Sequence, residues 1–80
     1  MNAQTLDKLE EVLKQNLEAD IIALLAQRLQ LDAETAIDLY YASELARQVD
    51  EGTFGIQYLS PQYLADDLIE NEGKLIDRLL

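Results

Sequence analysis

The chain has 80 residues, with 16 Asp and Glu against six Lys and Arg, no His and no Cys, and a formal net charge of −10. Without Cys there is no disulfide, no thiolate nucleophile and no zinc or iron–sulfur site of the usual ligand type. Without His the commonest general acid–base group is missing. Eighty residues make one small domain at most, so we expect residues 1–80 to form a single helical domain.

Apolar residues make up 49% of the chain, which is too much for a disordered acidic tail. The longest uninterrupted apolar run is Ile21 to Ala26, far short of the ~20 residues that a membrane span needs. The first five residues lack the basic start and apolar core of a signal peptide. These features predict a cytoplasmic protein that binds no membrane.

A four-residue repeat of apolar residues predicts a first helix over residues 4–30. The members of the repeat are Leu9, Leu13, Leu17, Ile21, Leu25 and Leu29. Because helical residues advance by ~100° each, a four-residue repeat rotates by roughly 40° per step. The apolar surface therefore swings part of the way round the helix, and we expect its two ends to face different partners.

A second helix is predicted over residues 33–50, where Asp32 is a good N-cap and Glu34 suits the helix dipole. Gly52 supplies its left-handed C-terminal stop. On a helical wheel the inward side gathers Leu39, Ala42, Leu45, Ala46 and Val49, extended by Ile37 and Tyr41. Tyr40 falls on the opposite, acidic side.

Residues 52–59 contain two Gly, and this composition predicts a short extended loop. Ser60 and Pro61 then form a strong helix start. The third helix is predicted over residues 61–72, with Tyr63, Leu64, Leu68 and Ile69 directed inward. Residues 74–80 form a short final helix or a kinked continuation. The fold expected is all-α, a compact bundle of three to four helices with the long first helix antiparallel to the second.

Residues 25–39 resemble the spacing of a DNA-binding helix-turn-helix. Over residues 32–51, however, Arg47 is opposed by Asp32, Glu34, Asp38, Glu44, Asp50 and Glu51. Phosphate groups repel such a helix, because nucleic-acid affinity depends on Lys and Arg. We therefore expect no binding of nucleic acid.

Two carboxylate pairs lie one helical turn apart, Glu34 with Asp38 and Asp66 with Glu70. Such pairs can hold divalent cations, but di-metal bundle sites also need His, and the spaced oxygens of a calcium loop are missing. We interpret both pairs as solvated helix faces and predict no metal and no cofactor. A chain this short also offers little room for a catalytic cleft, since pockets typically take ~300–1,000 Å³, so we predict no enzyme.

An acidic all-helical chain of this length also fits an acyl carrier protein, which carries phosphopantetheine on a Ser in an Asp-Ser-Leu sequence. Ser43 follows Ala and lies inside the predicted second helix, and Ser60 is accounted for as a helix cap. Neither matches the carrier motif, so this is the weaker alternative.

The aromatic residues supply core mass in a chain without Trp, and we assign Tyr41 and Phe54 to the core. Tyr40 is different, because an exposed Tyr beside charged residues is enriched at protein interfaces. We predict that Tyr40 contacts a partner, a prediction that its burial inside the domain's own core would rule out.

Three segments carry a family resemblance that covers about residues 20–70. They are Ile37–Ser43, Gly52–Tyr58 and Tyr63–Ile69, the last with a Tyr-Leu-x-Asp-Asp element. The chain resembles a family of short all-helical bacterial proteins of uncharacterised function, associated with toxin–antitoxin-like operons. The resemblance implies an antitoxin or accessory role and brings no catalytic residues with it. Residues 1–18 lie outside the family's pattern.

Taken together, these observations predict a small acidic protein-binding module with a basic protein partner. The partner-binding residues predicted are Tyr40 as an anchor and the carboxylates of Glu34, Asp38, Glu44, Asp66, Asp67 and Glu70. An alternative is a structural homodimer that uses apolar surface on the first helix and the C-terminal leucines.

Overall fold

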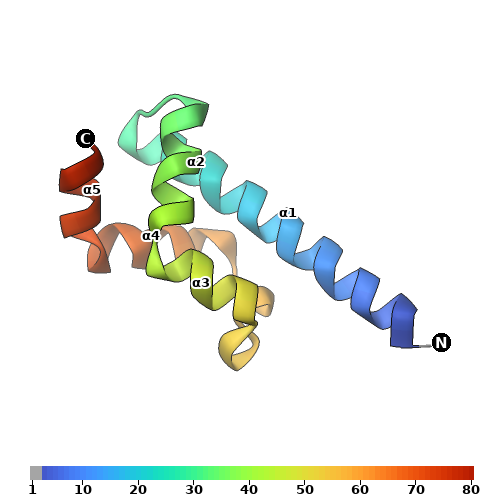
Figure 1. The fold of residues 1–80 in the computed structure, drawn as a ribbon. Helices are drawn as coiled ribbons and strands as arrows, with labels where there is room; N and C mark the ends of the chain where they lie inside the picture. The colour runs from blue at the N-terminus through green and yellow to red at the C-terminus, as the bar shows by residue number, and fades with distance from the viewer. Residues whose placement is uncertain (1–2) are drawn as a thin grey trace.

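The computed structural model describes residues 3–80, with the side chains of residues 3–7, 54 and 57 left out of the description. Over this part the chain is all-helical, with five α-helices and one 3-10 helix (Figure 1). They are α1 (Ala3–Leu29), α2 (Ala33–Ala42), α3 (Glu44–Glu51), η1 (Thr53–Tyr58), α4 (Pro61–Asn71) and α5 (Gly73–Leu79). The all-α class is confirmed, with more helices than the three to four expected.

Helix α1 packs mainly against α2 and α4, and α5 contacts both α2 and α4. Figure 1 shows α1 along one edge of the molecule, with its N-terminal half extending beyond the other helices. The extents of the molecule are 45 × 22 × 18 Å, so its length is essentially that of α1. The antiparallel packing expected of the first two helices stays a prediction.

Among residues 3–80, no helix is both long and apolar enough to span a membrane.

The core lies where α1 meets the shorter helices. Its largest buried side chains are Ile21, Leu25, Leu39, Tyr40, Leu45, Val49 and Leu68. In α1 only the middle of the apolar repeat is buried, from Leu17 to Leu25, whereas Leu9 is 51% exposed. The repeat is thus longer than the surface that the rest of the domain can cover.

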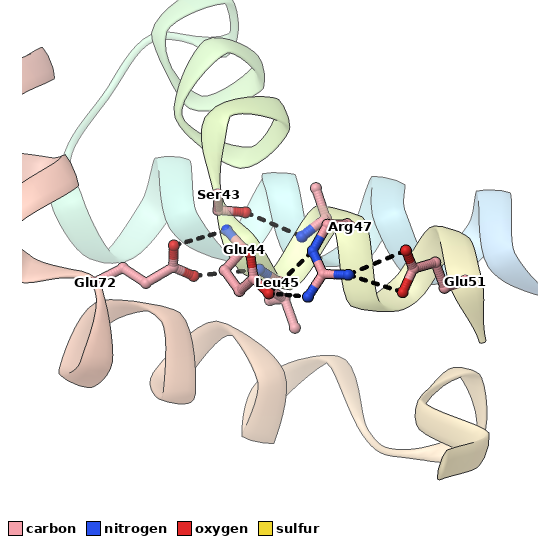
Figure 2. Close-up of polar contacts among 7 residues, drawn as sticks. Ser43, Glu44, Leu45, Arg47, Glu51 and Glu72 are labelled. Carbon is pink, nitrogen blue, oxygen red and sulfur yellow. Dashed lines mark hydrogen bonds and ion pairs between the residues drawn. The ribbon is translucent and has the colours of Figure 1, made fainter. Parts of the chain in front are cut away.

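The prediction of one continuous helix over residues 33–50 is wrong, because the chain leaves the helical conformation at Ser43. This residue is extended, with φ −84° and ψ 154°, and serves as the N-cap of α3. Its Oγ accepts a hydrogen bond from the backbone N–H of Ala46 at 3.1 Å (Figure 2), and its hydroxyl donates to the carbonyl of Tyr40. Ser43 is therefore a junction between two helices and does not lie inside one.

A second cap comes from Glu72, which lies between α4 and α5. Its Oε1 accepts from the N–H of Glu44 at 2.8 Å and its Oε2 from the N–H of Leu45 at 3.3 Å (Figure 2). The first N–H groups of a helix have no partner within the helix, and its positive end favours a carboxylate. With Ser43 bonded to Ala46, the first three N–H groups of α3 all have acceptors.

The remaining boundaries follow the local signals more closely. Asp32 accepts from the N–H of Thr35 at 2.8 Å and Ser60 from the N–H of Tyr63 at 3.1 Å, which confirms both caps. Gly52 ends α3 in the left-handed conformation, with φ 68°. The extended loop expected after it is wrong: Thr53–Tyr58 winds into a 3-10 helix.

The C-terminal segment forms its own helix. Helix α4 ends at Asn71, Glu72 adopts a non-helical conformation with φ −118° and ψ 38°, and α5 begins at Gly73. The predicted third helix is thus one residue too long. The residue excluded from it is the one whose side chain caps α3.

Glu72→Ala should lower the free energy of unfolding by about 1–2 kcal/mol, since it leaves two N–H groups of α3 without an acceptor. Glu70→Ala is the matched control, because Glu70 is exposed on the last turn of α4. Urea unfolding followed by circular dichroism measures both. Equal stability of the two variants would contradict a capping role for Glu72.

Candidate functional site: an acidic face on α2

Helix α2 has one buried side and one exposed side. Ala36, Leu39 and Tyr40 are buried. The exposed side carries Glu34, Ile37, Asp38 and Tyr41, which we call the α2 stripe. Their spacing of i, i+3, i+4 and i+7 places all four on one face of the helix.

The two apolar members of the α2 stripe are well exposed, Ile37 at 42% and Tyr41 at 62%. The predictions that both belong to the core are wrong, and Ala42 is exposed as well. The wheel that placed them inside treated residues 33–50 as one helix. Because the chain breaks at Ser43, α2 and α3 point in different directions in Figure 1 and turn different faces inward.

All the charged residues of the α2 stripe are negative. Helix α2 contains no Lys or Arg, and no Lys or Arg that the structure describes forms an ion pair with Glu34 or Asp38. At the start of the helix, hydrogen bonds from Thr35 hold the pKa of Asp32 below its ordinary value, so its charge persists in mild acid. The face therefore combines negative charge with exposed apolar surface.

Two of the other predicted carboxylates, Glu44 and Asp66, form ion pairs within the molecule. Glu44 pairs with Arg47, whose hydrogen bond lowers the pKa of that carboxyl, and Arg47 also reaches Glu51 at 2.9 Å (Figure 2). Asp66 pairs with Arg28 of α1.

On α4, Asp67 accepts a hydrogen bond from Asn71 Nδ2 at 2.7 Å, whereas Glu70 is exposed. The six predicted carboxylates are thus spread over α2, α3 and α4. Within this set, Glu34 and Asp38 share a helix face with exposed apolar side chains. They carry the candidate site.

Tyr40 is not on the surface. Its side chain is 0% exposed, and its ring meets that of Tyr41 edge-on with centroids 5.2 Å apart. The prediction that Tyr40 anchors a partner is therefore wrong, for the same reason that Tyr41 was placed in the core. The exposed aromatic residue of α2 is its neighbour in the chain.

The buried hydroxyl of Tyr40 makes no hydrogen bond of normal geometry with the side chains and backbone that the structure describes, although the Glu18 carboxylate is close enough to act on it. Burial, reinforced by the negative charge of Glu18, raises the pKa of Tyr40 above its ordinary value of 10.0. The hydroxyl is therefore neutral throughout the physiological range, and it contributes packing rather than chemistry.

A second exposed apolar group lies where η1 meets α4. Tyr58 is 69%, Leu59 47% and Tyr63 61% exposed, so the inward direction predicted for Tyr63 is wrong. A depression of about 200 Å³ beside them is lined by Gln48, Thr53, Ile56 and Leu59. It is smaller than the pockets that usually hold small molecules. No group of three or more acidic side chains placed to hold a metal ion occurs in the part of the chain that is described.

No family model, no curated protein and no solved structure matches the chain. The resemblance to short bacterial proteins associated with toxin–antitoxin-like operons therefore stays a prediction, and the functional argument depends on the geometry of α2.

Tyr40→Phe should raise the free energy of unfolding at pH 7 by up to about 1 kcal/mol, because a buried donor without a partner is costly. It should also weaken the loss of stability in alkali. In the wild-type protein the pKa of Tyr40 is higher in the folded state than its ordinary value of 10.0. Above about pH 10 the unfolded chain therefore releases this proton more readily than the folded protein, which lowers the free energy of unfolding. The Phe variant has no such proton and does not undergo this loss.

Tyr41→Phe is the matched control, because that hydroxyl belongs to an exposed side chain. Urea unfolding of both variants at neutral pH and at about pH 11 provides the comparison. A Tyr40→Phe protein that is less stable than wild type at pH 7 would show that the hydroxyl has a partner.

Proposed function

We propose that the chain is a small acidic, non-enzymatic protein-binding module and that the α2 stripe is its docking surface for a basic partner. The observation that supports this proposal is the exposure of Ile37 and Tyr41 beside Glu34 and Asp38, two carboxylates that pair with no Lys or Arg among the described residues. A protein of net charge −10 attracts basic partners from a distance, whatever surface finally makes the contact.

The two kinds of side chain in the α2 stripe have different roles in this proposal. Glu34 and Asp38 accelerate encounter with a positively charged surface, an effect that salt screens over ~8–10 Å. Tyr41 and Ile37 supply the desolvated contact area that slows dissociation, as aromatic anchors do at many interfaces. Charge therefore governs the association rate, and the apolar pair governs the lifetime of the complex.

The helical spacing also specifies the shape of the partner's site. A single exposed helix face with an apolar pair one turn apart fits a groove that takes the side of a helix. The groove would be apolar at its base and bordered by Lys or Arg. In an antitoxin role, proposed from the family resemblance, that groove would be a basic substrate-binding patch on a cytoplasmic toxin, masked by α2.

The test compares two charge-neutralising pairs of substitutions. Glu34→Gln/Asp38→Asn removes two charges from the α2 stripe, whereas Glu10→Gln/Glu11→Gln removes two charges from exposed positions of α1. Both proteins and wild type are used to capture partners from a lysate of the source cells, with quantitative mass spectrometry. We expect basic proteins to be retained by wild type and the α1 variant and depleted with the α2 variant.

A captured protein is then purified and its binding kinetics are measured. Glu34→Gln/Asp38→Asn should slow association roughly tenfold at low salt, with little difference at high salt. Tyr41→Ala should instead speed dissociation. If no captured protein distinguishes the α2 variant from the α1 variant, α2 is not the docking surface.

A further inference from the structure

The outward side of α1 carries a second, uncharged pattern, apolar except for Asn16 and distinct from the one that faces the core. Its positions alternate between spacings of three and four residues, as in a coiled coil. They are Leu9, Val12, Asn16, Ala19, Ala23 and Ala26, which we call the α1 seam. Leu9 and Val12 are 51% and 49% exposed, the next three residues are exposed, and Ala26 is half-buried.

From Leu9 to Ala23, every member of the α1 seam is exposed in the described part of the chain. Helix α1 contacts α2, α3, α4 and η1, and its buried residues Leu17, Ile21 and Leu25 lie on the opposite side of the helix from the α1 seam. Figure 1 shows the other helices gathered on one side of α1, along its C-terminal half. Helix α1 therefore has two apolar faces, of which the domain uses one.

The distribution of charge on α1 limits which kind of partner can bind the α1 seam. The α1 seam contains no charged residue, although the chain carries 16 acidic ones. It is bordered by one residue of each sign, Lys8 and Asp20. A basic partner is drawn to carboxylates, and the one carboxylate that borders this face, Asp20, is balanced by Lys8. Two copies of an anionic chain repel each other over most of their surfaces, and an uncharged face is where they can approach.

The sizes of the side chains favour an antiparallel pair. The three residues of the N-terminal half of the α1 seam have the larger side chains, and the three residues of the C-terminal half are all alanine. When two helices run in opposite directions, the layers become Leu9 with Ala26, Val12 with Ala23 and Asn16 with Ala19, so every larger residue meets a small one. A parallel pair would crowd large residues at one end and leave alanine layers underpacked at the other.

We propose that the α1 seam binds a second copy of this chain, as an antiparallel, two-fold symmetric helix pair. The same surface serves both copies, as a two-fold interface requires. From Leu9 to Ala26 the seam is about 26 Å long at 1.5 Å per residue. A single helix pair of that length buries less than a standard protein–protein interface, so the dimer is weak and reversible.

Sedimentation of the full chain over a concentration series tests the association. The dimer fraction should rise with concentration and also with salt, because salt screens the repulsion between two copies of charge −10. Ala19→Glu should weaken association tenfold or more, since it places carboxylates inside the contact. Ala33→Glu adds the same charge at an exposed alanine of α2 and should leave association unchanged.

A chain that stays monomeric at every concentration and salt would overturn the proposal. So would equal association of the two glutamate variants. Because binding of a basic partner weakens with salt whereas this dimer strengthens, the two proposals fail separately. A monomer that still captures a basic protein through α2 contradicts only the α1 seam.

Single cysteines test the orientation, since the natural chain has none. Val12→Cys and Ala23→Cys proteins, one of them tagged, are mixed under mild oxidation. The antiparallel pair should yield the mixed disulfide, with much slower bridging in either variant alone, because disulfides need Cα atoms within ~7 Å. Self-bridging of Val12→Cys as fast as mixed bridging would overturn the antiparallel arrangement, and Ala33→Cys measures random collision.

Discussion

The N-terminus of α3 depends on one acceptor next to it in the chain and on a second from a distant part of the chain. Ser43 bonds the N–H of Ala46, and Glu72 bonds those of Glu44 and Leu45. A helix can begin inside a folded domain only if its first N–H groups find partners, because each group left unpaired loses its hydrogen bond with water. The acceptors at this junction are what allow the chain to turn sharply after α2, and they also tie the α4–α5 connection to the middle of the chain.

The direction of that turn decides which side chains of α2 are inside. With the helix interrupted at Ser43, α2 buries Ala36, Leu39 and Tyr40 as a set of its own, and α3 separately buries Leu45, Ala46 and Val49. A continuous helix over residues 33–50 would have to bury both sets on the same side. In such a helix Tyr41 would face inward and Tyr40 outward. The α2 stripe thus exists because α3 is capped independently of α2.

The parts of this structure that were predictable from sequence are those decided within a few residues. The Asp32 and Ser60 caps and the Gly52 stop act on neighbouring backbone, and the apolar repeat of α1 needs only its own spacing. Glu72 could not be recognised as a cap, because its partners lie about 27 residues away.

For the candidate site, Glu34 and Asp38 were predicted as surface charges, but the exposure of Ile37 and Tyr41 was missed. Only the Ser-Glu pair at residues 43–44, a typical N-cap followed by a first-turn acid, could have signalled the break.

Charge placement then distinguishes the exposed apolar surface of α2 from that of α1. On α2, exposed Ile37 and Tyr41 are flanked by carboxylates, so the energetic cost of desolvating that face is offset only by a partner that brings positive charge. On α1, Leu9 and Val12 belong to a face whose bordering charges, Lys8 and Asp20, cancel, so a basic partner gains little there and a like-charged copy avoids the repulsion that it meets elsewhere. The same net charge therefore favours different occupants at the two surfaces, because attraction depends on where the carboxylates lie and not only on how many there are.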